Sequence, residues 1–441
     1  MPLNEILALG CIASFFILLA IGVPVALTLA ISGFVFGWLG FGSLLFNLLP
    51  ARIYGVTANY TLIAIPLFVF MGVMLEKSRI ADELMEVIGH VSGNLRGGMG
   101  IGIILVGVLM GATTGIVGAT IVTLGLLTLP TLLRRGYDKS LACGTICASG
   151  TLGQLIPPST IIILLADIMG QSVGTLFAAA VLPGLLLSGI FVVWMLLVGI
   201  IWPAKVPPIP VDERKALPRQ ELLLKVFKVA LPPIALVLAV LGSIIGGIAA
   251  PTEAASMGAV GSILVAALAR RLSWRTLVDV VHTTARVVAV MMFILICSQV
   301  FALAFRGLQG EQLVHDVFQM VPGGATGGLV FMLALIFVLG FFIEWIEISY
   351  IVVPMFLPMI IGAGLDQVWV ATLIAVVLQT SFLTPPFGWA LFYLRGVAPP
   401  EVTTLDIYKG VVPFIFLQLL ALAICFAYPG IATWLPKAIG W

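Results

Sequence analysis

Long apolar runs separated by short polar connections dominate the chain. The runs at 101–110, 182–202 and 411–427 contain no charged residue. A helix needs about 20 such residues to cross the hydrocarbon core of a bilayer, and water does not accommodate this much exposed apolar surface. The pattern therefore predicts an all-α polytopic protein embedded in a lipid bilayer, and the 441 residues allow about a dozen spans.

Composition narrows the class of protein further. Apolar residues make up 61% of the chain and charged residues 9%, whereas about 25% of residues are charged in an ordinary soluble domain. No stretch is left for a soluble catalytic domain. A net charge of +2 provides no basic field, so we expect no nucleic-acid partner. The five cysteines form no CxxC pair and the three histidines lie in polar connections, so no transition-metal site is expected.

The sequence contains an internal repeat at a shift of about 227 to 229 positions. The spacing from Pro130 to Pro157 is 27 residues, and Pro358 and Pro385 in the second half have the same spacing. The matched pairs are Pro24 with Pro251, Gly111 with Gly340, Pro130 with Pro358, Gly136 with Gly364, Asp138 with Asp366, and Pro157-Pro158 with Pro385-Pro386. A shared order and spacing of landmarks is typical of a duplicated unit. We therefore divide the chain into a first repeat at 1–203, a polar cytoplasmic linker at 204–225 and a second repeat at 226–441.

Charge indicates that the two repeats have inverted topology. The loop after Pro130 reads LLRRGYDK, and the matching loop after Pro358 reads IIGAGLDQ, without a positive charge. Cytoplasmic loops are enriched in Lys and Arg, and inverted copies place equivalent loops on opposite sides of the membrane. Threading the chain in this way puts 18 of the 21 Lys and Arg residues on the cytoplasmic face. Both termini are then expected outside.

Each repeat is expected to contain a re-entrant helical hairpin followed by a broken transmembrane helix. The hairpins fall at about 97–130 and 323–358, where two arms of about 15 residues each are too short to span the bilayer. The following helices, at about 140–170 and 367–394, carry Pro-Pro near the centre. Proline removes a backbone donor and clashes with the preceding turn, so both helices should break there.

A helix break inside hydrocarbon is expensive unless it lines a cavity or binds a ligand. The two breaks offer hydroxyls, small residues and free carbonyl groups at the same depth, which suits a monovalent cation. Helix N-termini that face the same point favour an anionic substrate such as a carboxylate. Paired broken helices in inverted repeats therefore point to a transporter site, and a pair of packing kinks is the alternative.

Two carboxylates, Glu344 and Glu347, are expected deep in the membrane. An intramembrane ionisable residue is a functional candidate by default, because a charge there is costly. The two groups would hold sodium, or one of them would carry a proton through a raised pKa. The alternative is that the second hairpin sits shallower and that both carboxylates contact water.

Four stretches of the chain resemble one known family. They are GATTGIVGATIVTLGLLTLPTLLRRGYD at 111–138, GTLGQLIPPST at 150–160, GIAAPTEAAS at 247–256 and LTPPFGWALF at 383–392. They look like the large membrane subunit of a TRAP transporter, the tripartite ATP-independent periplasmic type, and the resemblance covers essentially the whole chain. It implies an elevator-type secondary importer in the bacterial inner membrane, driven by a sodium gradient, with the outside termini in the periplasm. It also implies two partners, a small four-helix membrane subunit and a periplasmic substrate-binding protein.

The resemblance also assigns candidate residues to two ion sites. The first hairpin tip, at 115–120, lies opposite the break at 153–159, and the second tip, near 344–349, lies opposite 380–386. Candidate ligands of the first site are Thr114, Gly115, Gly118, Thr120, Gly153, Pro157 and Ser159. Candidate ligands of the second site are Glu344, Glu347, Ser349, Thr380, Ser381, Thr384 and Pro385. The chain departs from the family at two points, since it has Gly115-Ile116-Val117 where many relatives have a Gly-Ser-Ser tip, and Glu344 where the family often has Asp.

No arginine is placed at mid-membrane, so the substrate is expected to contact Thr113, Thr114, Ser159 and Thr384. The function that follows is translocation of an organic acid, with sodium as the coupling ion and no other cofactor. One alternative is a stand-alone sodium-coupled or proton-coupled carboxylate carrier of the same superfamily. Another is a membrane-embedded enzyme, but we find no HExxH motif, no paired intramembrane aspartates and no GxSxG motif on a helix, so no catalytic residue is expected.

Overall fold

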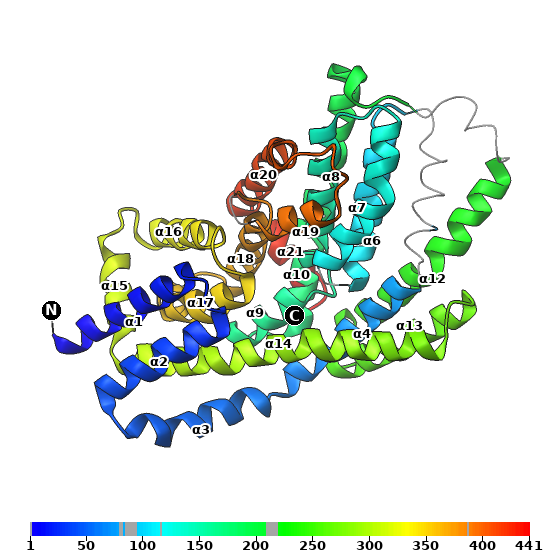
Figure 1. Cartoon of the computed structure of the whole chain (residues 1–441). Helices are drawn as coiled ribbons and strands as arrows, with labels where there is room; N and C mark the ends of the chain where they lie inside the picture. The colour runs from blue at the N-terminus through cyan, green and yellow to red at the C-terminus, as the bar shows by residue number, and fades with distance from the viewer. Residues whose placement is uncertain (1, 79–82, 84–94, 115–116, 209–218, 386–387) are drawn as a thin grey trace.

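The computed structural model describes residues 2–78, 83, 95–114, 117–208, 219–385 and 388–441, and the side chains at 113–114, 219–226 and 317–319 are not described. The first half contains α1 (Leu3–Ala20), α2 (Val25–Phe41), α3 (Leu44–Thr57), η1 (Tyr60–Ile63), α4 (Ala64–Lys77), α6 (Gly98–Thr114), α7 (Val117–Arg134), α8 (Lys139–Thr151), η2 (Leu152–Gln154), α9 (Thr160–Met169), α10 (Val173–Ile201) and η3 (Pro203–Lys205). The second contains α12 (Arg219–Ile245), α13 (Pro251–Leu268), α14 (Trp274–Gly307), α15 (Gly310–Met320), α16 (Gly324–Leu339), α17 (Trp345–Gly362), α18 (Gln367–Ser381), α19 (Trp389–Val397), α20 (Thr404–Ala427) and α21 (Gly430–Ala438). The described chain is therefore built from helices, as Figure 1 shows.

Nine helices in the described ranges are long and apolar enough to cross a membrane. Their outer faces carry large apolar side chains, and Ile200, Leu238 and Phe416 are 76%, 63% and 68% exposed. Such surfaces are favourable against lipid and unfavourable in water. The prediction of an all-α multi-pass membrane protein is therefore confirmed. The helix α12 begins at Arg219, within the stretch expected as a linker.

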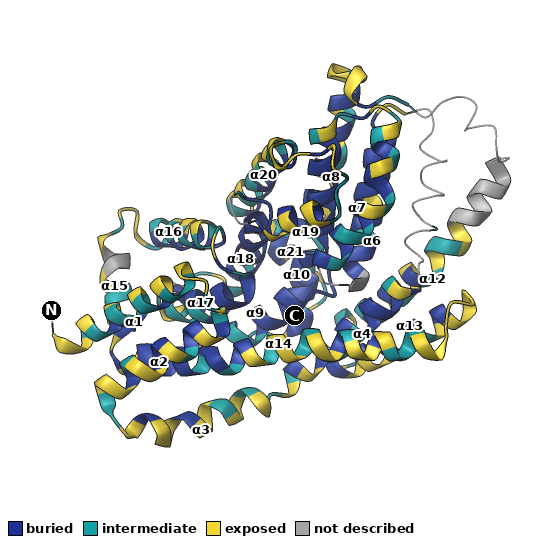
Figure 2. Ribbon diagram, viewed as in Figure 1, coloured by how far each residue is buried: buried dark blue, intermediate teal, exposed yellow. Residues whose placement is uncertain are grey.

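The centre of the molecule is formed by helices that are buried on every side. All residues of α8 from Leu141 to Thr151 are buried, and so are those of α18 from Val370 to Ser381. Figure 2 shows this centre as the dark region around α8, α9, α10 and α18. Small residues allow the close packing: a Cβ on Gly144 of α8 would overlap the carbonyl group of Gly410 in α20. The two backbones are thus in direct contact.

The landmark residues shared by the two halves form the same local structure twice. The helices α7 and α17 are followed by Gly136 and Gly364, which have φ angles of +76° and +68°. Glycine adopts this left-handed conformation without strain. Asp138 then caps α8 by accepting the Leu141 N–H at 2.9 Å, and Asp366 caps α18 by accepting its first N–H groups at 2.9 and 3.2 Å. These local rules explain why glycine and aspartate recur at a fixed spacing.

A second group of helices packs along one side of this centre. The longest helix, α14, packs against α2 and α4, and α4 also packs against α13 (Figure 1). The contact of α2 with α14 is close, since a Cβ on Gly33 would lie 2.7 Å from the backbone nitrogen of Phe301. Contacts across the two groups connect α4 to α6 and α14 to α17.

Candidate functional site

The first interruption separates α8 from α9. The helix ends at Thr151, one turn of 3-10 helix follows in η2, and regular helix resumes only at Thr160. Two prolines lie between them, Pro157 and Pro158, joined by a cis peptide bond, and neither can donate a backbone hydrogen bond. Ser159 Oγ donates a hydrogen bond to the carbonyl oxygen of Gln154, across the interruption. The predicted ligands Gly153, Pro157 and Ser159 are all buried here.

The second interruption separates α18 from α19. The first helix ends at Ser381 and the second begins at Trp389. Residues 386–387, which include the second proline of the pair, lie outside the described residues. Thr384 Oγ1 donates to the carbonyl oxygen of Thr380 at 2.9 Å, and both side chains are buried. Pro385 is half-buried. The two interruptions therefore share proline and hydroxyl side chains.

The C-terminal ends of α6 and α16 each contact the end of a broken helix at a glycine. A Cβ on Gly111 of α6 would lie 2.5 Å from the backbone nitrogen of Gly153, and a Cβ on Gly340, after α16, would lie 2.7 Å from Ser381 Oγ. Neither position has room for a side chain, so the backbone of the preceding helix touches the end of the broken one. Gly111 and Gly340 are a matched pair of the repeat.

The first predicted tip is described only in part. Thr114 is the last residue of α6, but Gly115 and the side chains of Thr113 and Thr114 lie outside the described residues. Gly118 and Thr120 are buried in the first turns of α7, and Thr120 is fully buried. A Cβ on Gly150, near the end of α8, would lie 2.2 Å from Ile121, so the start of α7 packs against the end of α8.

The second predicted tip places two carboxylates at the start of α17. Glu344 is the N-cap residue and Glu347 lies in the first turn. Glu347 is 1% exposed, and its Oε2 atom has no hydrogen-bond partner among the described residues. The positive end of the helix dipole favours a negative charge at this position. One oxygen of a buried carboxylate is therefore left to bind a proton or a cation.

Hydroxyl groups at the second tip and the second interruption are oriented so that their oxygen atoms remain acceptors. Each donates its proton to a backbone carbonyl, which leaves lone pairs for a cation. Ser349 Oγ donates to the carbonyl oxygen of Trp345 at 2.7 Å, Thr380 Oγ1 to that of Val376 at 3.1 Å, and Ser381 Oγ to that of Leu378 at 2.5 Å. Neutral oxygens of this kind are ligands for hard cations. Over the described ranges, no three His, Cys, Asp or Glu residues converge as a transition-metal site would require.

The two interruptions meet in a buried polar cluster that the sequence analysis missed. Gln379 Nε2 of α18 and Gln418 Nε2 of α20 both lie 3.5 Å from Thr151 Oγ1 at the end of α8. Both glutamines are fully buried, and their Oε1 atoms have no partner in the described structure. Thr151 and Gln379 are 228 residues apart, so the repeat spacing was the signal that could have identified the pair.

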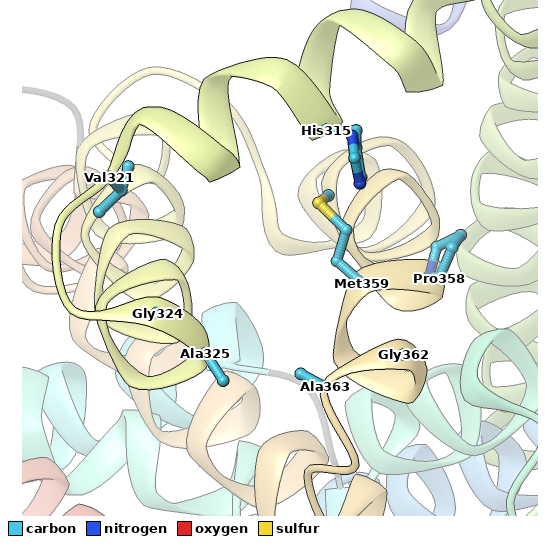
Figure 3. Close-up of a pocket in the computed structure, with 8 residues that line it drawn as sticks. All are labelled: His315, Val321, Gly324, Ala325, Pro358, Met359, Gly362 and Ala363. Atoms are coloured by element: carbon cyan, nitrogen blue, oxygen red, sulfur yellow. The ribbon is translucent and has the colours of Figure 1, made fainter.

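A separate cavity of about 730 Å³ lies between α15, the start of α16 and the end of α17. Its walls include His315, Gly324 and Met359, and Figure 3 shows the side chains of His315 and Met359 on neighbouring helices beside the opening. None of the predicted ion or substrate residues lines it. The candidate site is therefore at the interruptions and not in this cavity.

Solved structures with a similar fold define the class. The YdaH transporter of Alcanivorax borkumensis has a TM-score of 0.62 with 14% identity, over 88% of this chain and 89% of its own. MtrF of Neisseria gonorrhoeae, described as an antimetabolite efflux pump, has a TM-score of 0.57 with 14% identity, over 88% of this chain and 84% of its own. The chain thus has the fold of a multi-pass membrane transporter.

Sequence comparison then identifies the family. The model of the family "Tripartite ATP-independent periplasmic transporter, DctM component" matches residues 12–431. The C4-dicarboxylate TRAP transporter large permease protein DctM of Pseudomonas aeruginosa is 31% identical over 89% of this chain and 90% of its own. The protein of the same name in Vibrio cholerae is 29% identical over 96% of both chains. The ectoine large permease TeaC of Halomonas elongata is 28% identical over 96% of this chain and 97% of its own. The chain belongs to the DctM family, the large permease subunits of TRAP transporters, and is not an enzyme.

Proposed function

We propose that this chain is the solute-translocating subunit of a sodium-coupled importer of an organic acid, which receives its substrate from a periplasmic binding protein. The observation that carries the proposal is the contact between the two interrupted helices, where Gln379 Nε2 lies 3.5 Å from Thr151 Oγ1. Non-helical backbone at membrane depth is tolerated only where protein buries it or where it lines a cavity. Paired interruptions that converge are characteristic of transporter binding sites.

An inverted-repeat architecture is supported by contacts that occur twice. Gly111 approaches Gly153 in the first half, and Gly340 approaches Ser381 in the second. The two pairs are related by shifts of 229 and 228 positions. A packing kink that arose once by chance has no reason to be accompanied by the same glycine contact in both halves.

Packing between the halves supports the same architecture. The helix α7 packs against α19, and α17 packs against α9. If α7 corresponds to α17 and α9 to α19, each of these contacts becomes the other when the repeats are exchanged. By the same spacing α2 corresponds to α13 and α4 to α14. The contact of α2 with α14 therefore becomes the contact of α13 with α4 when the repeats are exchanged. Such reciprocity is expected for two copies related by a pseudo-two-fold axis in the membrane plane.

The helices before each interruption are proposed to be arms of re-entrant hairpins. At 1.5 Å per residue, α6 with 17 residues and α16 with 16 residues are roughly 26 and 24 Å long, short of the hydrocarbon thickness of about 30 Å. An elevator motion would carry these hairpins together with the broken helices. In the corresponding topology the Arg134 loop is cytoplasmic and both termini are periplasmic.

Sodium is the proposed coupling ion because the site offers oxygen ligands of the right kind. Hydroxyls of Ser159, Thr380 and Thr384 donate to carbonyls and keep lone pairs for a cation. The unpartnered Oε2 of Glu347 supplies a negative charge that a bound cation would compensate. A proton on the same carboxylate is the competing coupling ion. A carrier that used this proton would be driven by a proton gradient instead of a sodium gradient.

The substrate class follows from the chemistry of the relatives. Their names specify C4-dicarboxylates, ectoine and sialic acid, which carry a carboxylate group, and isethionate, whose acid group is a sulfonate. The isethionate relative named DctMQ is longer, and this chain spans 64% of its length. Membership of the DctM family supports a small membrane subunit as a partner of this chain.

Uptake by reconstituted proteoliposomes tests the proposal. The chain would be combined with a small four-helix subunit and a periplasmic binding protein, and uptake of labelled succinate, sialic acid and ectoine would be measured with sodium replaced by choline at constant pH. We expect uptake of a carboxylate that requires both sodium and the binding protein. Uptake that ignores sodium and follows pH would overturn sodium coupling, whereas uptake by the chain alone would identify a stand-alone carrier.

A further inference from the structure

The two short helices that follow the interruptions differ in how much of their surface is open. Trp389, Phe392 and Tyr393 on α19 are 36%, 51% and 38% exposed. The residues 228 positions earlier on α9 are Ile161, Leu164 and Leu165, and they are 0%, 1% and 1% exposed. Equivalent faces of the two repeats are therefore covered in one half and open in the other.

The cover over α9 comes from both halves of the chain. The helices α10, α17 and α18 pack against α9, as do η1 and α4, and Leu165 lines a narrow gap with Leu176 of α10 and Ala375 of α18. Asn59 Nδ2 donates a hydrogen bond to Asp167 Oδ1 near the end of α9. Tyr350 of α17 also approaches Asp167, with its hydroxyl 3.5 Å from Oδ2. By contrast, α19 packs mainly against α7, α8 and α20. The open side of the site is thus the side of α19.

Tyr393 occupies a special position on the open face because its ring covers a residue of the first predicted tip. A Cβ on Gly118 of α7 would lie 2.7 Å from Cζ of Tyr393 and 2.9 Å from both Cε atoms, so the hydroxyl end of the ring covers this glycine. The contact of Cys147 Sγ with the Ala390 carbonyl oxygen at 3.7 Å fixes α19 against α8.

An aromatic ring with a hydroxyl is suited to contact an organic acid at this position. The hydroxyl can donate a hydrogen bond to a carboxylate, and the ring supplies an apolar surface for the rest of the substrate. The equivalent leucine in the first repeat, Leu165, offers neither an opening nor a donor. The difference between the two residues therefore assigns different tasks to α9 and α19.

We infer that Tyr393 lines the aqueous path from the site between the tips and contacts the substrate there, as a specificity-determining residue. The inference rests on the proposed function, because it takes the substrate to be a carboxylate. In the proposed topology this path leads to the cytoplasm, so the structure represents the inward-open arrangement. The covered face of α9 would be the corresponding wall of the path on the periplasmic side.

Thiol labelling tests the path without requiring transport. Single substitutions Tyr393→Cys, Leu165→Cys and Phe416→Cys would be treated in proteoliposomes with a membrane-impermeant methanethiosulfonate reagent applied from each side. The five native cysteines are buried, and Phe416, 68% exposed on α20, is the lipid-facing control. We expect Tyr393→Cys to react from the cytoplasmic side much faster than the other two. Equal rates at Tyr393→Cys and Phe416→Cys would show that Tyr393 faces lipid and would overturn the inference.

Substrate contact is tested with succinate as the probe, in the complete reconstituted system. Tyr393→Phe removes the hydroxyl and keeps the ring, so the succinate concentration at half-maximal uptake should rise about tenfold, the effect of one hydrogen bond to a charged group. The maximal rate and the sodium dependence should stay unchanged, and so should uptake by Phe416→Leu. Protection of Tyr393→Cys from labelling by succinate is the independent readout. Unchanged half-saturation together with no protection would refute the contact, whereas loss of sodium dependence in the unmodified protein would refute the proposed function alone.

Discussion

Adding one methyl group to Gly111 is expected to disturb the first ion site more than it disturbs the fold. Its ideal Cβ position lies 2.1 Å from Cα of Gly153, whereas non-bonded carbon contacts lie at about 3.5 to 4.0 Å. The α6 backbone and the first interruption must therefore separate by more than about 1 Å. Since the obstructing atoms belong to the backbone, no side chain can rotate away to relieve the contact.

The magnitudes separate the effect on stability from the effect on transport. Overpacking of this kind destabilises by about 1 to 3 kcal/mol, and alanine in place of glycine within a helix recovers about 1 kcal/mol. The net loss of stability for Gly111→Ala is then about 0 to 2 kcal/mol. Metal-ligand distances must hold within about 0.2 Å, and a displacement of about 1 Å at a reacting centre costs on the order of 100-fold. We therefore expect transport to fall far more than stability.

The assay compares Gly111→Ala with Gly189→Ala in α10, where an added Cβ meets nothing within 4 Å. Initial rates of sodium-dependent uptake would be measured in proteoliposomes, and thermal unfolding would be followed for the purified variants. We expect Gly189→Ala to behave like the unmodified protein and Gly111→Ala to remain folded with little uptake. Equal uptake by the two variants would refute the role assigned to the contact of Gly111 with Gly153.

Three further changes probe other parts of the site. Glu347→Gln keeps the side-chain volume but removes the charge, so the sodium concentration for half-maximal uptake should rise by about tenfold or more, as measured by uptake at varied sodium. Gln418→Leu removes a long hydrogen bond of 3.5 Å together with an unpartnered oxygen; because such an oxygen costs about 1 to 3 kcal/mol, thermal unfolding should be unchanged or shifted upward, and a clear drop would contradict this. Asn59→Ala removes a hydrogen-bond partner of Asp167 but leaves the α10 and α18 side chains that cover Leu165 in place, so Leu165→Cys should react with the impermeant thiol reagent as slowly in this background as alone, and a clear acceleration would contradict this.

Features governed by local rules were predictable from the sequence. The ends of α8 and α18 follow from the proline pairs that begin at Pro157 and Pro385, since proline cannot donate to the helix ladder. The starts of the same helices follow from Asp138 and Asp366, whose carboxylates cap the first turn. Apolar run length gave the multi-pass class, because the thickness of a bilayer fixes the length of a spanning helix.

Features governed by approach in space were not predictable in the same way. No local pattern indicates that Gln418 reaches Thr151, since the two residues are 267 positions apart. The exposure of Tyr393 depends on which helices leave α19 open, and its own sequence neighbourhood gives no sign of it. The candidate ligands at the interruptions could be named because they lie next to prolines, whereas those at the first tip, around Gly115, fall outside the described residues.

The two repeats keep glycine at a position where geometry leaves no choice. At the approach of each preceding helix the residue is glycine in both halves, Gly111 and Gly340, because any side chain would overlap the interruption. The partner differs, since Gly153 presents backbone atoms and Ser381 presents its Cβ atom, 2.0 Å from an added Cβ on Gly340. Rotation of a side chain relieves neither contact. A transporter that opens one half while the other stays closed needs equal spacing in its two repeats, but different contacts on the helices that line the path. Leu165 on α9 and Tyr393 on α19 are such a pair, since the first is buried and the second is exposed where substrate would leave.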